Sequence, residues 1–293
     1  MATTTANAKL RHNEYYGQQS TLDELYERSL NGANFNKLYE KIIEESNILL
    51  AYRNIKANTG SNTKGTDGKT IKDVADMTNE QVIAMVRARL SKYRPQSVRR
   101  VEIKKDNGKL RPLGIPTMSD RLIQQCILQI LEPICEAKFH NHSFGFRPNR
   151  STEHAIATMY KMINCQNLHF VVDIDVKGFF DNVDHGKLLK QMWTMGIQDK
   201  ELLCIISAML KAEIEGIGIP IKGTPQGGIL SPLLSNVVLN ELDWWISDQW
   251  ESLETSYPYV QNCHKTYALK NNSRLKECYI VRYADDCAPR RRN

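Results

Sequence analysis

The sequence predicts an α+β fold, in which many helices accompany a few short strands. Apolar residues recur at helical spacing along most of the 293 residues. Two short runs rich in Val, Ile, Phe and Tyr, at 168–176 and 278–283, are typical of strands instead. Apolar residues make up 41% of the chain, enough to bury a core, which excludes an intrinsically disordered protein. At this length, one large or two ordinary domains are expected.

Four helices of the first half are marked by a Ser, Thr or Asn cap residue followed by an apolar stripe. The expected caps are Thr21, Asn34, Thr78 and Ser119. Residues 58–70, rich in Gly, Asn and Thr, predict a loop. Pro133 is expected to bend or end the last of these helices. The apolar stripes are most simply explained as core faces.

The second half of the chain alternates between the two patterns. A strand over 168–176 would place Asp173 and Asp175 on one face, because successive side chains of a strand point to opposite sides. Helical spacing follows at 188–195, at 202–210 and in a long amphipathic segment from Ser231 through Trp245. The strand at 278–283 then leads directly into Asp285 and Asp286.

Two adjacent acids after a strand predict a tight turn that holds both carboxylates at a sheet edge. An isolated Asp-Asp pair is more often a solvated turn. Here the aspartates of the other strand favour a metal site, because adjacent carboxylates repel unless a cation lies between them. Mg²⁺ prefers carboxylate and phosphate oxygens, and two such ions can clamp a phosphoryl transfer.

Positive charge is concentrated in one stretch. The chain has 39 Lys and Arg against 33 Asp and Glu, a net charge of +6. Residues 87–111 alone carry ten basic residues and two acids, a local net charge of +8. A polyanion is the natural partner of such a segment, and an ordinary solvated surface is the alternative.

The cysteines and the absence of a long apolar run predict a cytoplasmic protein without a membrane span. Seven cysteines are scattered and never spaced as C-x-x-C, which argues against a disulfide framework and a ribbon-type zinc site. No apolar run approaches the roughly 18 residues of a membrane helix. Cys135, His140 and His142 lack a fourth local metal ligand, so ordinary structural side chains are the preferred interpretation.

Five segments in order carry a resemblance to a known family. They are GKLRPLGIPTMSDR (108–121), SFGFRPNRS (143–151), VDIDVKGFFDNVDH (172–185), KGTPQGGILSPLLSNVVLNELD (222–243) and RYADD (282–286). Together they resemble group II intron-encoded reverse transcriptases, also called maturases. The match covers roughly residues 99–286, and TDG at 66–68 extends it to a template-contacting loop. Five motifs in sequence order make coincidence improbable.

The resemblance implies a right-hand polymerase with fingers and palm, an antiparallel palm sheet with packed helices, and no thumb. The fingers, with an N-terminal helical extension, would be 1–122 and 183–230, and the palm 123–182 and 231–293. After Asp286 the family continues with an apolar strand, whereas this chain has Pro289 and three arginines. The returning strand is therefore expected to have at most two residues. This departure predicts a fragment of a longer protein with loosely held acids.

The resemblance also implies a metal site with two Mg²⁺ ions, for which Mn²⁺ is a substitute. The catalytic acids correspond to Asp175, Asp285 and Asp286, and the backbone carbonyl of Val176 is an additional metal ligand. Asp173 is excluded because only Asp175 begins the family pattern DVKGFFD. Asp173 is expected to make a supporting hydrogen bond instead.

The remaining site residues follow from the same resemblance. Those implied to bind the deoxynucleotide are Lys105, Arg111, Phe180, Gln226 and Gly227, with Phe180 as a steric gate against a ribose 2′-hydroxyl. Those implied to bind nucleic acid are Arg99, Arg100, Arg147 and Arg150. For Phe180 the alternative is a core position, and for the last two arginines it is ordinary surface pairing.

The function implied is RNA-directed DNA synthesis together with binding of intron RNA, which assists splicing and mobility. The partners would be group II intron RNA, an RNA template, a DNA primer and dNTP, with a homodimer left open and no membrane. One alternative is an RNA-binding maturase module that is inactive as a polymerase in this truncated form. Another is a retron-type or diversity-generating reverse transcriptase.

Overall fold

The computed structural model describes residues 11–104, 108, 110–166, 168–225, 227–287 and 290–291. The chain divides into two compact units, each built from two segments. Unit 1 comprises Met1–Lys138 and Phe180–Ser231, and unit 2 comprises Phe139–Phe179 and Pro232–Asn293. Helices mixed with small antiparallel sheets confirm the α+β prediction. The names fingers and palm, and the boundaries given to them above, stay predictions.

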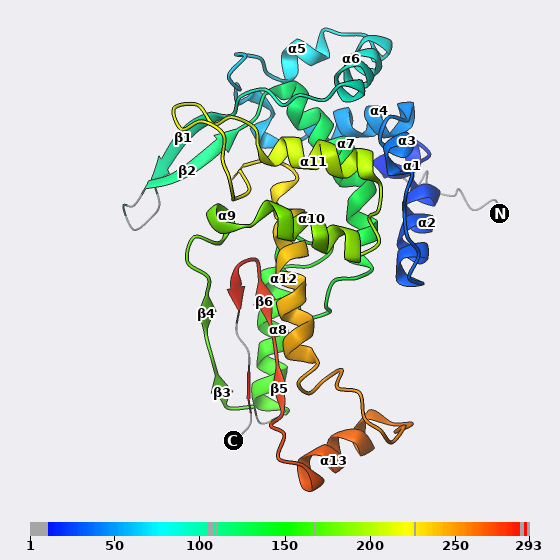
Figure 1. Ribbon diagram of the computed structural model, residues 1–293, viewed down its shortest axis with the longest axis vertical. Helices are drawn as coiled ribbons and strands as arrows, with labels where there is room; N and C mark the ends of the chain where they lie inside the picture. The colour runs from blue at the N-terminus through cyan, green and yellow to red at the C-terminus, as the bar shows by residue number, and fades with distance from the viewer. Residues whose placement is uncertain are drawn as a thin grey trace, which may run out of the picture. The chain divides into compact units, whose positions relative to one another are not determined.

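Unit 1 is mainly helical and is built around one long helix (Figure 1). Its first helices are α1 (His12–Tyr15), α2 (Gln19–Leu30), α3 (Leu38–Ile42), α4 (Glu45–Lys56), α5 (Ile71–Ala75) and α6 (Asn79–Ser91). The strands β1 (Arg99–Lys104) and β2 (Leu110–Ile115) form an antiparallel hairpin that leads into α7 (Met118–Glu136). The helices α9 (Phe179–Asn182), α10 (His185–Thr194) and α11 (Lys200–Leu210) follow later in the chain.

Helix α7 is the core of unit 1, because α2, α3, α4 and α6 all contact it. Ile123, Ile127 and Ile130 on it are fully buried. Pro133 does not end this helix, as one of the two expectations held, because α7 continues to Glu136. Proline removes one backbone hydrogen bond, yet the helix runs three residues beyond it.

One of the four expected helix caps is confirmed. Thr78 accepts a hydrogen bond from the backbone N–H of Gln81, whose side chain accepts one in return, as in a capping box. Thr117 rather than Ser119 caps α7, and Thr21 lies inside α2. Asn34 precedes α3 without capping it. The N–H of the neighbouring Phe35 instead donates to the carbonyl of Gly196, a residue distant in the sequence.

The loop predicted at 58–70 is held against the start of α7, with one short 3-10 turn at Thr59–Asn62. The buried guanidinium of Arg121 donates to the carbonyls of Pro116, Gly60 and Thr63. A side chain at Gly65 would place its Cβ 2.6 Å from Thr117 Cα. These contacts pack the loop closely against the residues that begin α7.

The described residues of unit 2 form three helices and two three-stranded sheets. The helices are α8 (Thr152–Asn164), α12 (Ser231–Ser247), which begins at the unit boundary, and α13 (Asn262–Asn272). The strands are β3 (Phe170–Val171), β4 (Ile174–Asp175), β5 (Cys278–Tyr279), β6 (Arg282–Tyr283), β7 (Asp286–Cys287) and β8 (Arg290–Arg291). One antiparallel sheet has the order β3-β8-β5 and the other β4-β7-β6.

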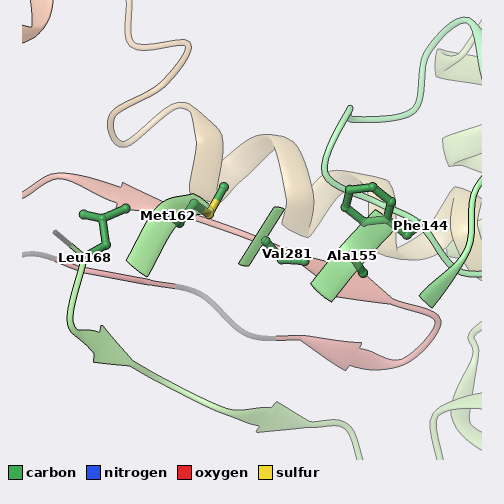
Figure 2. Close-up of a cluster of buried hydrophobic side chains, with 5 residues drawn as sticks. All are labelled: Phe144, Ala155, Met162, Leu168 and Val281. Atoms are coloured by element: carbon green, nitrogen blue, oxygen red, sulfur yellow. The ribbon is translucent and has the colours of Figure 1, made fainter. Parts of the chain in front are cut away.

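The two strands predicted at 168–176 and 278–283 are each broken into two short strands in different sheets. The returning strand has two residues in β7, as expected, but pairing resumes in β8 after Pro289. Between the broken strands and α8 lies a buried cluster, which Figure 2 shows. It consists of Phe144, Ala155, Met162, Leu168 and Val281. This cluster packs the 278–283 segment against α8.

Among the described residues, no helix is both long and apolar enough to cross a membrane.

Candidate functional site

Strand pairing in unit 2 brings the three predicted acids together. Asp175 of β4 and Asp286 of β7 are direct partners in the antiparallel register. Tyr283 of β6 pairs with Asp286 on the other side, so Ala284 and Asp285 form a two-residue turn between β6 and β7. The turn is visible between β6 and the adjoining strand in Figure 1. Segments far apart in the sequence thus bring Asp175, Asp285 and Asp286 to one end of the β4-β7-β6 sheet.

The charges around Asp175, Asp285 and Asp286 favour a bound cation. Burial raises the pKa of Asp286 first, and the negative charges of Asp285, Asp175 and Asp173 raise it further. Repulsion of this kind is relieved by a cation placed among the carboxylates. A set of carboxylate oxygens suits hard divalent ions such as Mg²⁺. The residues present therefore fit the metal site that the sequence resemblance implies.

Two further details bear on the predicted ligands. The carbonyl of Val176 accepts a hydrogen bond from the N–H of Phe179, at 3.2 Å, and a carbonyl oxygen has a second lone pair for another partner. Asp173 is exposed, and within the described residues its carboxylate makes no hydrogen bond. The supporting hydrogen bond expected of Asp173 is therefore absent from that part of the chain.

Sequence reasoning missed the pair beneath the acids. Arg282 and Asp243 are both fully buried, and their side chains form an ion pair of 2.7 Å. Arg282 stands among the mainly apolar residues of CYIVRY, and Asp243 stands between Leu242 and Trp244. A charge at such a position is a signal that could have been read, because buried charges are almost always paired.

The predicted nucleotide-binding residues belong to unit 1, and two of them, Phe180 and Gly227, have described contacts there. Phe180 of α9 is half-buried, and its carbonyl accepts a hydrogen bond from the N–H of Thr224 at 2.7 Å. Gly227 has a φ of 109°, and a Cβ there would lie 2.6 Å from the Gly114 carbonyl of β2. Only glycine fits this approach without strain. The segment containing PQGG therefore contacts both α9 and the hairpin.

Three of the predicted residues have side chains outside the described part of the chain. Lys105 and Gln226 lie outside the described residues altogether, and Arg111 lies on β2 without a described side chain. Their contact with a nucleotide stays a prediction.

A cavity of about 330 Å³ lies beside the hairpin in unit 1. Its walls include Leu113, Ile214 and Pro220, with Arg100 and Lys222 among the charged lining residues. Arg100 is exposed and Arg99 half-buried on β1. These two predicted nucleic-acid contacts are thus accessible on a basic hairpin.

The other two predicted contacts differ in exposure. Arg147 is buried, donates to the carbonyls of His140 (2.7 Å) and Ser143 (2.9 Å), and lies over the Phe139 ring. This geometry braces a loop and does not favour contact with nucleic acid, which stays untested. Arg150 is half-buried and donates to the Asn141 carbonyl.

A second group of possible metal ligands lies in unit 2. A ring nitrogen of His140, one of His142 and a carboxylate oxygen of Glu251 lie within 4.8 Å of one another. However, Nδ1 of His140 accepts a hydrogen bond from the His142 N–H at 3.2 Å, so neutral His140 carries its proton on Nε2. That nitrogen is the one facing Glu251. A ligating histidine has the opposite arrangement, so structural histidines remain the better interpretation.

His140 is expected to make stability depend on pH. Burial lowers its pKa to about 4, helped by the charges of His142, Arg147 and Arg282, while Asp248 opposes them. An unfolded histidine titrates near 6.5, so the unfolded state binds more protons between about pH 4 and 6.5. Stability should therefore fall over this range by about 3 kcal/mol as the pH decreases. Urea unfolding of the wild type and of His140→Gln measures the difference, and parallel pH profiles would contradict it.

Comparisons with known proteins bear on the identity of this fold. A family model described as reverse transcriptase (RNA-dependent DNA polymerase) matches residues 103–288. Protein YkfC of Escherichia coli K12 is 37% identical over 264 residues, covering 85% of this chain and 69% of YkfC. The group II intron-encoded protein LtrA of Lactococcus lactis is 40% identical over 218 residues. That match covers 72% of this chain but only 35% of LtrA.

Among solved structures, a partial Cas6-RT-Cas1–Cas2 complex matches 86% of this chain and 38% of the matched chain, at 22% identity and a TM-score of 0.48.

Proposed function

Because the chain belongs to the reverse transcriptase family, in its group II intron-encoded branch, we propose that it carries the site at which a DNA primer is extended on an RNA template. The observation that carries the proposal is the register pairing of Asp175 with Asp286, next to Asp285. Members of the family use divalent metal ions. Primer extension with dNTP, dependent on both an RNA template and a divalent cation, is the experiment that tests it.

Asp175, Asp285 and Asp286 would hold two Mg²⁺ ions, with the Val176 carbonyl as a further ligand, and Mn²⁺ could replace them. Bound metal ions lower the pKa of a primer 3′-hydroxyl and stabilise the leaving pyrophosphate. The protein supplies no nucleophile in this scheme. Its own contribution would be to hold Asp175 and Asp286 on paired strands and Asp285 in the adjoining turn, and the register of the β4-β7-β6 sheet supports this.

The deoxynucleotide would be bound by residues of unit 1. Arg111 and Lys105 would contact the triphosphate, the first through its bidentate fork and the second as a point charge. Phe180 would exclude a ribose 2′-hydroxyl, and Gln226 with Gly227 would lie under the sugar and base. Support comes from the packing of Gly227 against the Gly114 carbonyl of β2, which holds this loop beside the strand that carries Arg111.

Intron RNA and the template-primer are the proposed partners of the basic hairpin. Arg99 and Arg100 lie on β1, in the stretch 87–111 whose net charge is +8. Binding should be strongly salt-dependent, because each phosphate contact releases condensed counterions. If six to ten phosphates are contacted, affinity should fall by roughly 10³ to 10⁵ between 50 and 200 mM salt. Filter binding of an intron RNA measures this, and salt-insensitive affinity would contradict the electrostatic account.

The second candidate function is that of a maturase module, which binds RNA but does not synthesise DNA. The accessible arginines on β1 favour it independently of the acids. A variant with Ala at all three acids separates the two functions, because RNA binding should survive while extension is lost. Loss of both together would show that the acids also support the RNA-binding fold.

A further inference from the structure

The side chain of Arg282 lies directly beneath the acidic turn. It is fully buried at the start of β6, one residue before Tyr283. Its Nε donates to both carboxylate oxygens of Asp243, at 2.8 and 3.0 Å, and its Nη2 donates to one of them at 2.7 Å. This forked contact fixes the orientation of the guanidinium plane relative to α12.

The remaining donors of Arg282 connect the turn to the rest of unit 2. Nη1 donates to the backbone carbonyl of Ala284 at 2.7 Å and to Oδ1 of Asn236 at 2.9 Å. Nη2 also donates to the hydroxyl of Ser143 at 2.6 Å. Ala284 is the residue between Tyr283 and Asp285, so the guanidinium bonds to the turn itself.

Gly145 also packs directly against the backbone of the turn. A Cβ at this position would overlap the backbone nitrogen of Ala284. The amide of Asn236 donates to the Gly145 carbonyl at 2.9 Å, while its oxygen accepts from Arg282. One asparagine thus joins the two groups that contact Ala284. Ala284 itself has a φ of 57°, a left-handed conformation that surrounding contacts must hold in place.

A buried ion pair is weak evidence for stability, because apolar residues of similar size often replace one without loss. An apolar pair, however, could not donate the hydrogen bond that Arg282 makes to the Ala284 carbonyl. We propose that Arg282 is a positioning residue, which holds the turn so that Asp285 and Asp286 stand at the separation from Asp175 that a divalent ion requires. The inference rests on the proposed function, since it assumes that these acids bind metal. Lysine could not serve, because one ammonium cannot satisfy Asp243, Asn236, Ser143 and Ala284 at once.

Mn²⁺ binding to the 293-residue chain tests this without requiring polymerisation. The electron paramagnetic resonance signal of free Mn²⁺ decreases on binding and yields the affinity. Arg282→Lys is expected to weaken binding by about 10- to 100-fold, the usual effect of losing a residue that orients metal ligands. Val237→Ala is the matched control, because it removes buried atoms from the same helix, α12, and its apolar side chain makes none of these hydrogen bonds. It should lower stability and leave Mn²⁺ affinity unchanged.

Wild-type affinity in folded Arg282→Lys would overturn the inference. If that variant does not fold, Arg282→Met combined with Asp243→Leu decides, because it removes the bond to Ala284 without leaving an unpaired buried charge. Weakened binding then supports the inference, and wild-type binding overturns it.

Asp285→Asn is the reference for the metal site. If this variant binds Mn²⁺ as the wild type does, the proposed metal site fails, and the inference fails with it. If Asp285→Asn loses binding while both Arg282→Lys and the double variant Arg282→Met with Asp243→Leu keep it, only the inference fails.

Discussion

Asp286→Asn is expected to lower the rate of primer extension by at least about a thousandfold while leaving RNA affinity unchanged. A metal ion contributes several kcal/mol of transition-state stabilisation, and each 1.36 kcal/mol is a factor of ten in rate. Asparagine has nearly the same shape as aspartate, so the pairing of Asp286 with Asp175 should persist. Extension of a labelled DNA primer on RNA, with filter binding of the same RNA, measures both quantities.

The matched control is Asp173→Asn. Asp173 is exposed, two residues before Asp175, and its negative charge also acts on Asp286. The family register nevertheless leaves it outside the metal site, so its loss should cost less than about tenfold. Wild-type extension by Asp286→Asn would remove Asp286 from the metal site. A larger loss for Asp173→Asn than for Asp175→Asn would show that the register is wrong.

Asp243→Ala is expected to destabilise the protein by about 3–5 kcal/mol, because it leaves the Arg282 charge buried without its partner. The side chains of the pair are 0% and 1% exposed, so water cannot replace the lost carboxylate. The midpoint of urea unfolding measures the change. Glu24→Ala is the control, because the Arg28–Glu24 pair is about half exposed and should contribute at most about 1 kcal/mol. Equal effects of the two variants would contradict the structural role of the buried pair.

The double variant Arg282→Met with Asp243→Leu separates stability from positioning. Replacing both charges by apolar side chains removes the unpaired buried charge and should recover much of the stability lost in Asp243→Ala. The hydrogen bond to the Ala284 carbonyl remains absent in this variant. Mn²⁺ affinity should therefore stay low although folding is restored. Full recovery of both would show that the pair serves stability alone.

Local sequence signals predicted the character of most elements but not their ends. The Thr78 cap is confirmed, because Thr78 and Gln81 satisfy each other within one turn of helix. The caps expected at Thr21 and Ser119 are wrong by a few residues, since other residues of the same loops begin those helices. The single strand expected at 168–176 is two strands, because each half pairs with a different partner.

For the candidate site, too, the sequence predicted some features and missed others. The motifs alone pointed to Asp175, Asp285 and Asp286, because the order of residue types along the chain carries the family resemblance. Nothing in that order shows that Arg147 turns inward to the carbonyls of His140 and Ser143. Whether an arginine faces solvent or binds the carbonyls of a loop depends on which other segments pack around it. The spacing of residue types along the sequence does not indicate this.

The sequence by itself determined the family, the mixture of helix and strand, and the acids proposed to bind metal, because these depend on residue types and spacings within short segments. Only the tertiary structure decided that Asp175 faces Asp286, and that Arg282, Asp243, Asn236 and Gly145 enclose the turn between them. Strand pairing and burial of charge join residues more than a hundred positions apart, so no local pattern can encode them separately.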